Sequence, residues 1–147
     1  MTVSEELKEL LKSTHKFTRT IWTSKTGISY IGYGHILSDK EDFVKLTKKQ
    51  CIELFEKDIS TINRSLTKLV KKEIPQNHFD ALASVLYDIG PTLFKKSSLL
   101  MLYNKGLLDE ASLRIMVWSK YKGIHSSALE YRRRIDYKIF TSNIYTE

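Results

Sequence analysis

The sequence Ile-Gly-Tyr-Gly-His at residues 31–35 decides the fold of this chain. It lies within residues 17–37, where Thr, Ile, Trp and Tyr dominate, and these residue types favour strands. Glycines interrupt this stretch at positions 27, 32 and 34, where they permit tight turns or a close approach of the backbone to a ligand. We therefore predict a small sheet here, with its turns near the glycines.

Helical patterns flank the predicted sheet on both sides. Leucines recur at helical spacing within residues 4–16, and Ser4 is a suitable N-cap. After the sheet, Thr47 and Gln50 form a capping-box pattern, in which the two side chains satisfy exposed backbone donors. The apolar residues that follow along one helix face are Ile52, Phe55, Ile59, Ile62, Leu66 and Leu69. This pattern predicts one long helix.

The C-terminal half predicts several shorter helices. Pro75 can begin a helix because the first turn does not need its missing N–H, and Gly90 can end that helix. Ser127 and Glu130 give a second capping-box pattern. The other helices are predicted at residues 98–104, 110–118 and 127–140.

The order of these elements predicts a single α+β, mainly helical domain over residues 1–147. A small sheet lobe (residues 17–46) is joined by a linking helix (residues 47–71) to a larger helical lobe (residues 75–147). Two lobes joined in this way leave a cleft between them, and such clefts are common ligand sites.

Composition limits the classes of partner. The net charge of +7 attracts polyanions, although a solubilising coat is an equal alternative. Lysines are scattered along the chain, which argues against a dedicated nucleic-acid surface.

The single cysteine, Cys51, excludes an internal disulfide and fits a reducing compartment. No His, Cys and Asp residues have zinc-site spacing, so we expect neither a metal nor a cofactor.

The N-terminus contains early acidic residues and no continuous apolar run. We therefore predict no signal peptide, and no stretch is long and apolar enough for a membrane span. The protein would be made in the cytoplasm, and a role outside the cell would require association with a virion or release by another factor. We expect a monomer.

The segment at residues 31–35 resembles the signature Thr-Ile-Gly-Tyr-Gly-His of phage-type lysozymes, the endolysins of glycoside hydrolase family 24. Further segments resemble family motifs in the same order along the chain: residues 75–82, 88–90, 97–106 and 128–140. Asp88 stands where the family usually has an asparagine, Ala128 where it has a glycine and Asp136 where it has a glutamate. The resemblance implies a lysozyme-like fold and a relation to peptidoglycan.

Hydrolysis in this family needs a protonated carboxyl group, a second carboxylate and a hydroxyl that helps to place water. The resemblance puts these groups at His15, which lies twenty positions before His35, at Ser24 and at Tyr30. Histidine adds positive charge where an oxocarbenium-like state would form, serine carries no negative charge, and tyrosine is much larger than threonine. We predict that no catalytic group is intact, and each such loss commonly costs about 10²–10⁴-fold in rate.

Other groups could replace the missing ones. Asp39, Glu41 and Asp42 could edge the cleft, but a solvated acidic loop is the favoured interpretation. Ser24 with His15 could form a nucleophilic pair, but no third, orienting acid is evident nearby in the sequence.

The resemblance also suggests residues of a substrate groove. Trp22 and Tyr33 could stack on sugar rings, and Gly34 and His35 lie in the same region, although packing of a small sheet explains the aromatic residues nearly as well. We expect His35 to pair with Asp58 on the linking helix as a structural ion pair between the lobes.

These observations favour a phage-derived, lysozyme-like protein that is catalytically inactive and serves peptidoglycan binding or a structural or partner-binding role. One alternative is a weakly active muramidase that works through His15 or an unrecognised acid. Another is a basic module that binds polyanions, which rests on charge alone. Fold does not choose among these functions.

Overall fold

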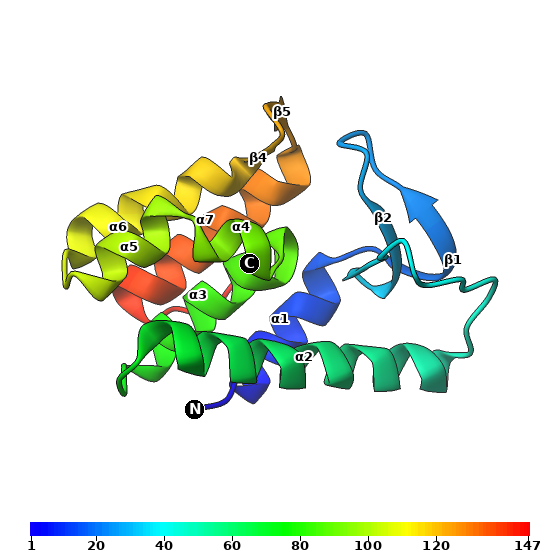
Figure 1. Cartoon of the computed structure of the whole chain (residues 1–147), viewed down its shortest axis with the longest axis horizontal. Coiled ribbons are helices and arrows are strands. Elements are labelled where there is room, and N and C mark those ends of the chain that lie inside the picture. Colours follow the sequence, from blue (N-terminus) through cyan, green and yellow to red (C-terminus); the bar gives the residue numbers. More distant parts are fainter.

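The computed structural model describes all 147 residues, and its mainly helical architecture with a small antiparallel sheet confirms the predicted class. Figure 1 shows the sheet at one end of the long helix α2, with most other helices gathered toward the other end. In chain order the elements are α1 (Glu5–Thr14), β1 (Phe17–Thr23), β2 (Ser29–Tyr33), β3 (His35–Ile36), α2 (Lys48–Val70), α3 (Gln76–Ile89), α4 (Pro91–Lys95), α5 (Ser98–Asn104), α6 (Leu108–Ile115), the 3₁₀ helix η1 (Met116–Ser119), β4 (Lys120–Tyr121), β5 (Ile124–His125) and α7 (Ser127–Ser142).

The sheet has the antiparallel order β1-β2-β3 and rests on the start of α2. A single residue, Gly34, separates β2 from β3, and its φ of 83° lies in the left-handed region that glycine adopts without strain. An added Cβ on Gly32 would lie 3.7 Å from the Cβ of Cys51 in α2. Gly34 therefore serves a tight turn, whereas at Gly32 the distance is an ordinary contact and the φ of 70° is what favours glycine.

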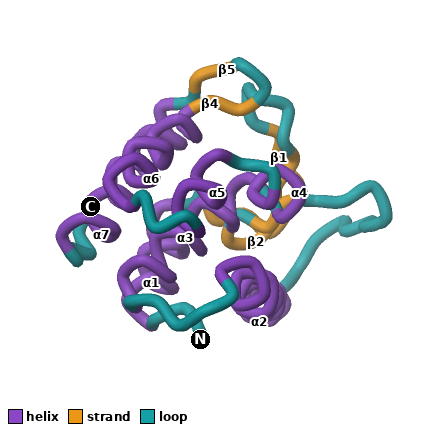
Figure 2. The backbone as a smooth tube through the Cα atoms, turned by 60° about the vertical axis from the view of Figure 1, so that its left-hand side comes forward, coloured by secondary structure: helices purple, strands orange, loops and turns teal.

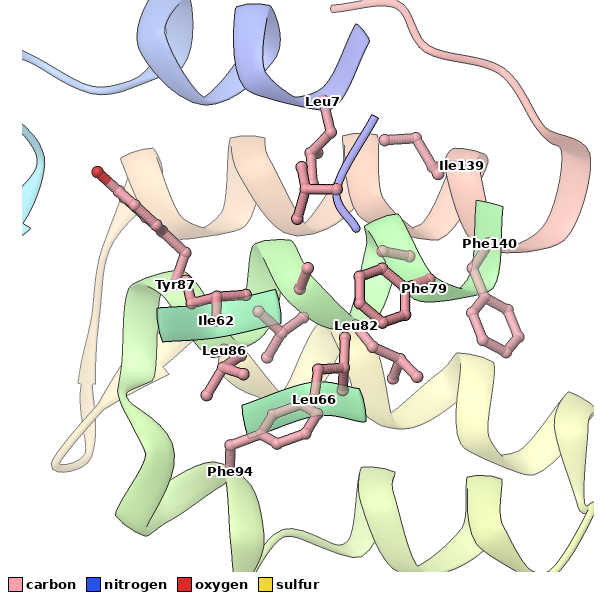
Figure 3. Packing of buried hydrophobic residues seen from close by; sticks show 14 of the residues in the cluster. Leu7, Ile62, Leu66, Phe79, Leu82, Leu86, Tyr87, Phe94, Ile139 and Phe140 are labelled. Carbon is pink, nitrogen blue, oxygen red and sulfur yellow. The ribbon is translucent and has the colours of Figure 1, made fainter. Parts of the chain in front are cut away.

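Helix α3 lies at the centre of the helical part, and Figure 2 shows other helices on several sides of it. Every residue from Phe79 to Ile89 is buried, polar ones included. Figure 3 shows Phe79 and Leu82 of α3 among side chains from neighbouring helices, such as Leu7 of α1 and Leu66 of α2. Because α3 is enclosed on all sides, its polar side chains must find partners inside the protein.

Two of the three predicted side-chain N-caps are confirmed. The Ser4 hydroxyl accepts from Leu7 N at 3.2 Å, and the Thr47–Gln50 capping box forms with both of its hydrogen bonds. The capping box predicted at Ser127 is wrong. Ser126 is the N-cap instead, because its own N–H is bonded to the Ser119 carbonyl at the end of the β4–β5 hairpin.

Short elements were not predicted from the sequence. Helix α4 and the hairpin β4–β5, whose strands have two residues each, are too short for a hydrophobic period to show. The loop of residues 37–47 between the sheet and α2 extends away from the body in Figure 2. None of the helices combines the length and apolar character needed to cross a membrane.

Candidate functional site

A cavity of about 530 Å³ lies between the β1–β2 hairpin, the end of α1 and the start of α7, and we call it the main cavity. Its lining includes His15, Ser24 and Tyr30, so the fold brings together the three positions that the family resemblance identified. The remaining lining residues are Thr14, Lys16, Trp22, Lys25, Thr26, Gly34, Ser126, Ser127, Ala128, Leu129 and Arg132. No aspartate or glutamate is among them.

His15 follows the last turn of α1 and is held on both ring nitrogens. Its Nδ1 lies 2.7 Å from the Leu11 carbonyl oxygen, and its Nε2 lies 2.6 Å from Oδ1 of Asp88 on α3. Only 7% of the residue is exposed, and the ring of Tyr87 packs edge-on against it at 5.1 Å. Both nitrogens are therefore directed at protein oxygens and not into the main cavity.

Asp88 belongs to a cluster of five buried ionisable residues, which we call the buried charge cluster: His15, Asp88, Arg132, Arg133 and Asp136. Arg132 Nε and Arg133 Nη2 donate to Asp88 Oδ2 at 2.8 and 2.6 Å, and Arg133 Nε donates to Asp136 at 2.8 Å. Burial alone would raise the pKa of Asp88, but the charges of Arg132, His15 and Arg133 outweigh it and hold that pKa well below its usual range. The cluster ties α1, α3 and α7 together.

The contact between His15 and Asp88 corrects one expectation. No orienting acid for His15 was evident nearby in the sequence, and the acid that contacts it lies 73 positions away. The signal was present in the family resemblance, which assigns a glutamate to position 15 and an asparagine to position 88, where this chain has His15 and Asp88. These two differences change charge in opposite directions, which suits two side chains in contact.

Ser24 lies at the β1–β2 turn and does not hydrogen-bond to His15. Its Oγ lies 2.7 Å from the Thr26 hydroxyl, and its N–H donates to the Ile28 carbonyl at 2.9 Å. Because both nitrogens of His15 are also engaged, the two residues do not form the nucleophile–base pair that the sequence left open.

Tyr30 fills part of the sheet side of the main cavity. Its ring stacks on the Trp22 ring with 5.3 Å between the ring centroids. The Nζ atom of Lys16 also contacts the Trp22 ring, at 4.5 Å from its centroid. Burial, with a smaller contribution from Asp88, raises the pKa of the Tyr30 hydroxyl to about 12. The indole Nε1 of Trp22 is buried and has no hydrogen-bond partner.

Of the two neighbouring groove candidates, Gly34 lines the main cavity and Tyr33 does not. The Tyr33 ring packs against Phe17 and Phe55, at centroid distances of 4.7 and 5.9 Å, and does not line the main cavity, which corrects its prediction as a groove residue. Its carbonyl accepts a short hydrogen bond from the Tyr87 hydroxyl. A Cβ added to Gly34 would lie 2.5 Å from His15 Cδ2, so the imidazole occupies the space next to this turn.

A second cavity of about 160 Å³ adjoins Gly34 from the other side and is lined by His35, Asp58 and residues of α2 and α3. His35 Nδ1 lies 2.7 Å from Asp58 Oδ2, and His35 Nε2 lies 3.0 Å from both carboxylate oxygens of Glu41. Burial lowers the pKa of His35, but the bonds and charges of Asp58 and Glu41 outweigh it and raise the pKa overall.

The acidic loop after β3 is only partly solvated, which corrects the expectation for one of its members. Glu41 contacts His35 and also accepts from Ser38 N at 2.9 Å, whereas Asp39 and Asp42 are exposed. No group of three or more His, Cys, Asp or Glu residues is arranged to hold a metal ion.

Comparisons with known proteins agree with this architecture. The phage lysozyme family matches residues 12–136. The endolysin of Bacillus phage PZA is 34% identical over 112 residues, which are 76% of this chain, but the chain spans only 43% of that protein. The endolysin of Acyrthosiphon pisum secondary endosymbiont phage 1 is 31% identical over 83% of both chains.

Two solved structures show the same fold over almost the whole chain. The endolysin of Escherichia coli O157:H7 phage FAHEc1 has a TM-score of 0.82 and 27% identity, and the comparison covers 100% of this chain and 98% of that one. The muramidase domain of SpmX from Asticaccaulis excentricus has a TM-score of 0.77 and 27% identity, with 95% and 97% covered. The chain therefore belongs to the phage lysozyme family.

Proposed function

We propose that this chain binds peptidoglycan glycan strands in the cleft between its lobes and does not hydrolyse them. One observation carries the proposal: the main cavity is retained, but it is lined by no carboxylate, and both nitrogens of His15 are bonded to protein oxygens. Glycoside hydrolysis in this family needs two carboxyl groups, one on each side of the scissile bond.

The acidic side chains outside the main cavity do not supply that pair. Asp39 and Glu41 line a separate cavity of about 540 Å³, and Glu41 is bonded to His35. Asp58 lines the second cavity but is bonded to His35, and no other carboxylate lines that cavity. Asp88 is 3% exposed and lies beneath His15 and Arg132, so it cannot reach a sugar linkage. These contacts support an inactive member of glycoside hydrolase family 24 over a weakly active muramidase.

Binding is the function that the remaining surface supports. The main cavity has a volume within the range of about 300–1,000 Å³ that is typical of ligand sites, and the Trp22 indole lines it. An aromatic ring with a polar edge suits a sugar, which has an apolar face and many hydroxyl groups. Such a binder would act where glycan strands are accessible, either on a virion or after release by another factor.

Sedimentation with insoluble, purified peptidoglycan tests the proposal. We expect the chain to sediment with the polymer at moderate salt and to leave the turbidity of the suspension unchanged. Trp22→Ala should reduce the sedimented fraction, whereas Ile21→Ala, its neighbour on β1 outside the lining of the main cavity, should not. Clearing of the suspension at enzyme-like concentrations would reject inactivity, and absence of sedimentation would reject binding.

A further inference from the structure

The charge of the main cavity points to a particular chemical group in its ligand. We propose that the cavity binds an oxyanion, a carboxylate or a phosphate, that is attached to a sugar. This inference rests on the proposed binding role for the choice of a sugar-linked ligand, and it adds the group that the former catalytic position now recognises.

Two lysines at the cavity have no acidic partner. Lys16 and Lys25 line the cavity, and neither forms an ion pair with an aspartate or glutamate. The ammonium group of Lys16 is held over the Trp22 ring by a cation–π contact. Their two positive charges are therefore available to a bound anion at the mouth of a concave site, where the surrounding protein strengthens electrostatic attraction.

The buried charge cluster behind the cavity does not cancel these charges. Its two arginines already match its two carboxylates, Asp88 and Asp136, before His15 is counted. Arg132, which also lines the cavity, contacts Asp88 through Nε and Nη2 and the Thr14 carbonyl through Nη1. A ligand in the cavity therefore meets no net negative charge from the protein beneath it.

Hydrogen-bonding residues also line the cavity. Trp22 is one of them, and its indole Nε1–H is buried without a partner in the protein. Hydroxyl groups of Ser24, Thr26 and Ser127 also line the cavity. Ser127 and Ala128 begin the 16-residue helix α7, and the N–H groups of a first helical turn favour an anion. The hydroxyls of Ser24 and Thr26 bond to each other, so the two lysines and the start of α7 carry the argument: cationic side chains around a cavity without carboxylates fit an oxyanion better than a neutral sugar.

Amide and indole NMR titrations of the intact chain test this inference with three probes. The probes are N-acetylmuramic acid, which carries a carboxylate, N-acetylglucosamine 6-phosphate and neutral N-acetylglucosamine. We expect both anionic sugars to shift the Trp22 indole signal and to bind about tenfold more tightly than the neutral sugar, since each exposed lysine contributes up to about fivefold. The Trp118 indole, which packs against the core elsewhere, serves as an internal control. The preferred anion then distinguishes a carboxylate from a phosphate source.

Matched variants test the role of the two lysines. Lys16→Gln with Lys25→Gln should remove the roughly tenfold preference. Lys68→Gln with Lys72→Gln, in the last turn of α2 and just after it, should retain it. Equal affinity for charged and neutral sugars, or no response to any sugar, would overturn the inference. If a short DNA oligonucleotide binds more tightly than both anionic sugars, and this binding depends on Lys16 and Lys25, the ligand of the cavity would be a nucleic acid and the inference of a sugar-linked anion would be wrong.

The results separate this inference from the proposed function. Sedimentation with peptidoglycan without a preference for anionic sugars would reject the oxyanion site and leave the binding role standing. A preference for anionic sugars without sedimentation would reject peptidoglycan binding and leave the oxyanion site standing.

Discussion

The surroundings of His15 and His35 show two different uses of an imidazole at two cavities that share Gly34. Each ring lies between two oxygen acceptors, and the two residues border the same turn at Gly34. The side chain of His15 is 3% exposed and faces a carboxylate that two arginines also contact. The side chain of His35 is 13% exposed and has two partly solvated carboxylates as partners.

The difference lies in what would remain if one contact were lost. Around His15 the alternative to the native pairing is a charge buried in protein, which is costly. Around His35 water can replace a lost partner, so the contact can respond to pH. The two regions therefore lead to different expectations for stability, and the expected effects run from the buried charge cluster to the His35 contacts.

Removal of Asp88 should give the largest effect. Asp88→Ala leaves Arg132 and Arg133 buried with one carboxylate between them, so we expect a loss of about 3–5 kcal/mol in the free energy of unfolding. Urea denaturation measures this loss. Glu130→Ala, which removes surface contacts with Arg134 and His125, should leave the midpoint almost unchanged. A similar, small change for both variants would show that the cluster does not hold the helices together.

A methyl group at Gly34 should have the next largest effect. Gly34→Ala places a Cβ 2.5 Å from a His15 ring that is fixed by two hydrogen bonds, at a positive φ. We expect a cost of about 3 kcal/mol, from about 1–2 kcal/mol for the backbone and the remainder for the clash. Gly27→Ala is the matched control, because Gly27 has a similar φ of 86° and nothing within 4 Å of the added Cβ. Equal costs for the two variants would contradict close packing of His15 against Gly34.

The hydrogen bond from Tyr87 to the Tyr33 carbonyl should have a smaller effect. Tyr87→Phe removes the donor and keeps the ring that packs on His15, so we expect a loss of about 0.5–1.5 kcal/mol in thermal or urea denaturation. An unchanged stability would mean that water replaces the lost donor at this carbonyl.

The contacts of His35 should give the smallest effect, visible as a dependence on pH. Because the folded protein raises the pKa of His35, its contribution is complete below the unfolded value of about 6.5 and is lost as pH rises through the higher folded value. The free energy of unfolding should therefore decline over that range. His35→Gln should flatten this part of the profile, and an identical slope in the variant would assign the decline to another group.

Local signals in the sequence predicted much of the fold. Ser4, Thr47 and Gln50 act through hydrogen bonds within three residues, so their caps could be read directly. The Ser126 cap was missed by one position because it depends on a hairpin of two-residue strands. Periodicity cannot reveal strands of that length.

The site could be predicted in its positions but not in its contacts. The spacing of the family motif identified His15, Ser24 and Tyr30, and the structure places all three in the lining of one cavity. The spacing could not show that Asp88 lies against His15, because that contact joins α3 to the end of α1 through tertiary packing. A bulge in β1 between Thr18 and Trp22 changes the strand register, so the sequence could not show that Trp22 lines the cavity while Tyr33 packs on Phe55.

A turbidity assay on purified peptidoglycan can show whether the His15–Asp88 pair blocks the position that the family resemblance assigns to the catalytic acid. A triple variant with His15→Glu, Ser24→Asp and Tyr30→Thr would place a new carboxylate against Asp88, and like charges in contact oppose each other. Adding Asp88→Asn to this variant removes the repulsion. The new carboxylate at position 15 and Asp136 then balance the charges of Arg132 and Arg133. We predict that the unmodified chain does not clear the suspension and that the quadruple variant clears it faster than the triple variant. Clearing by the unmodified chain, or equal rates for the two variants, would contradict this interpretation.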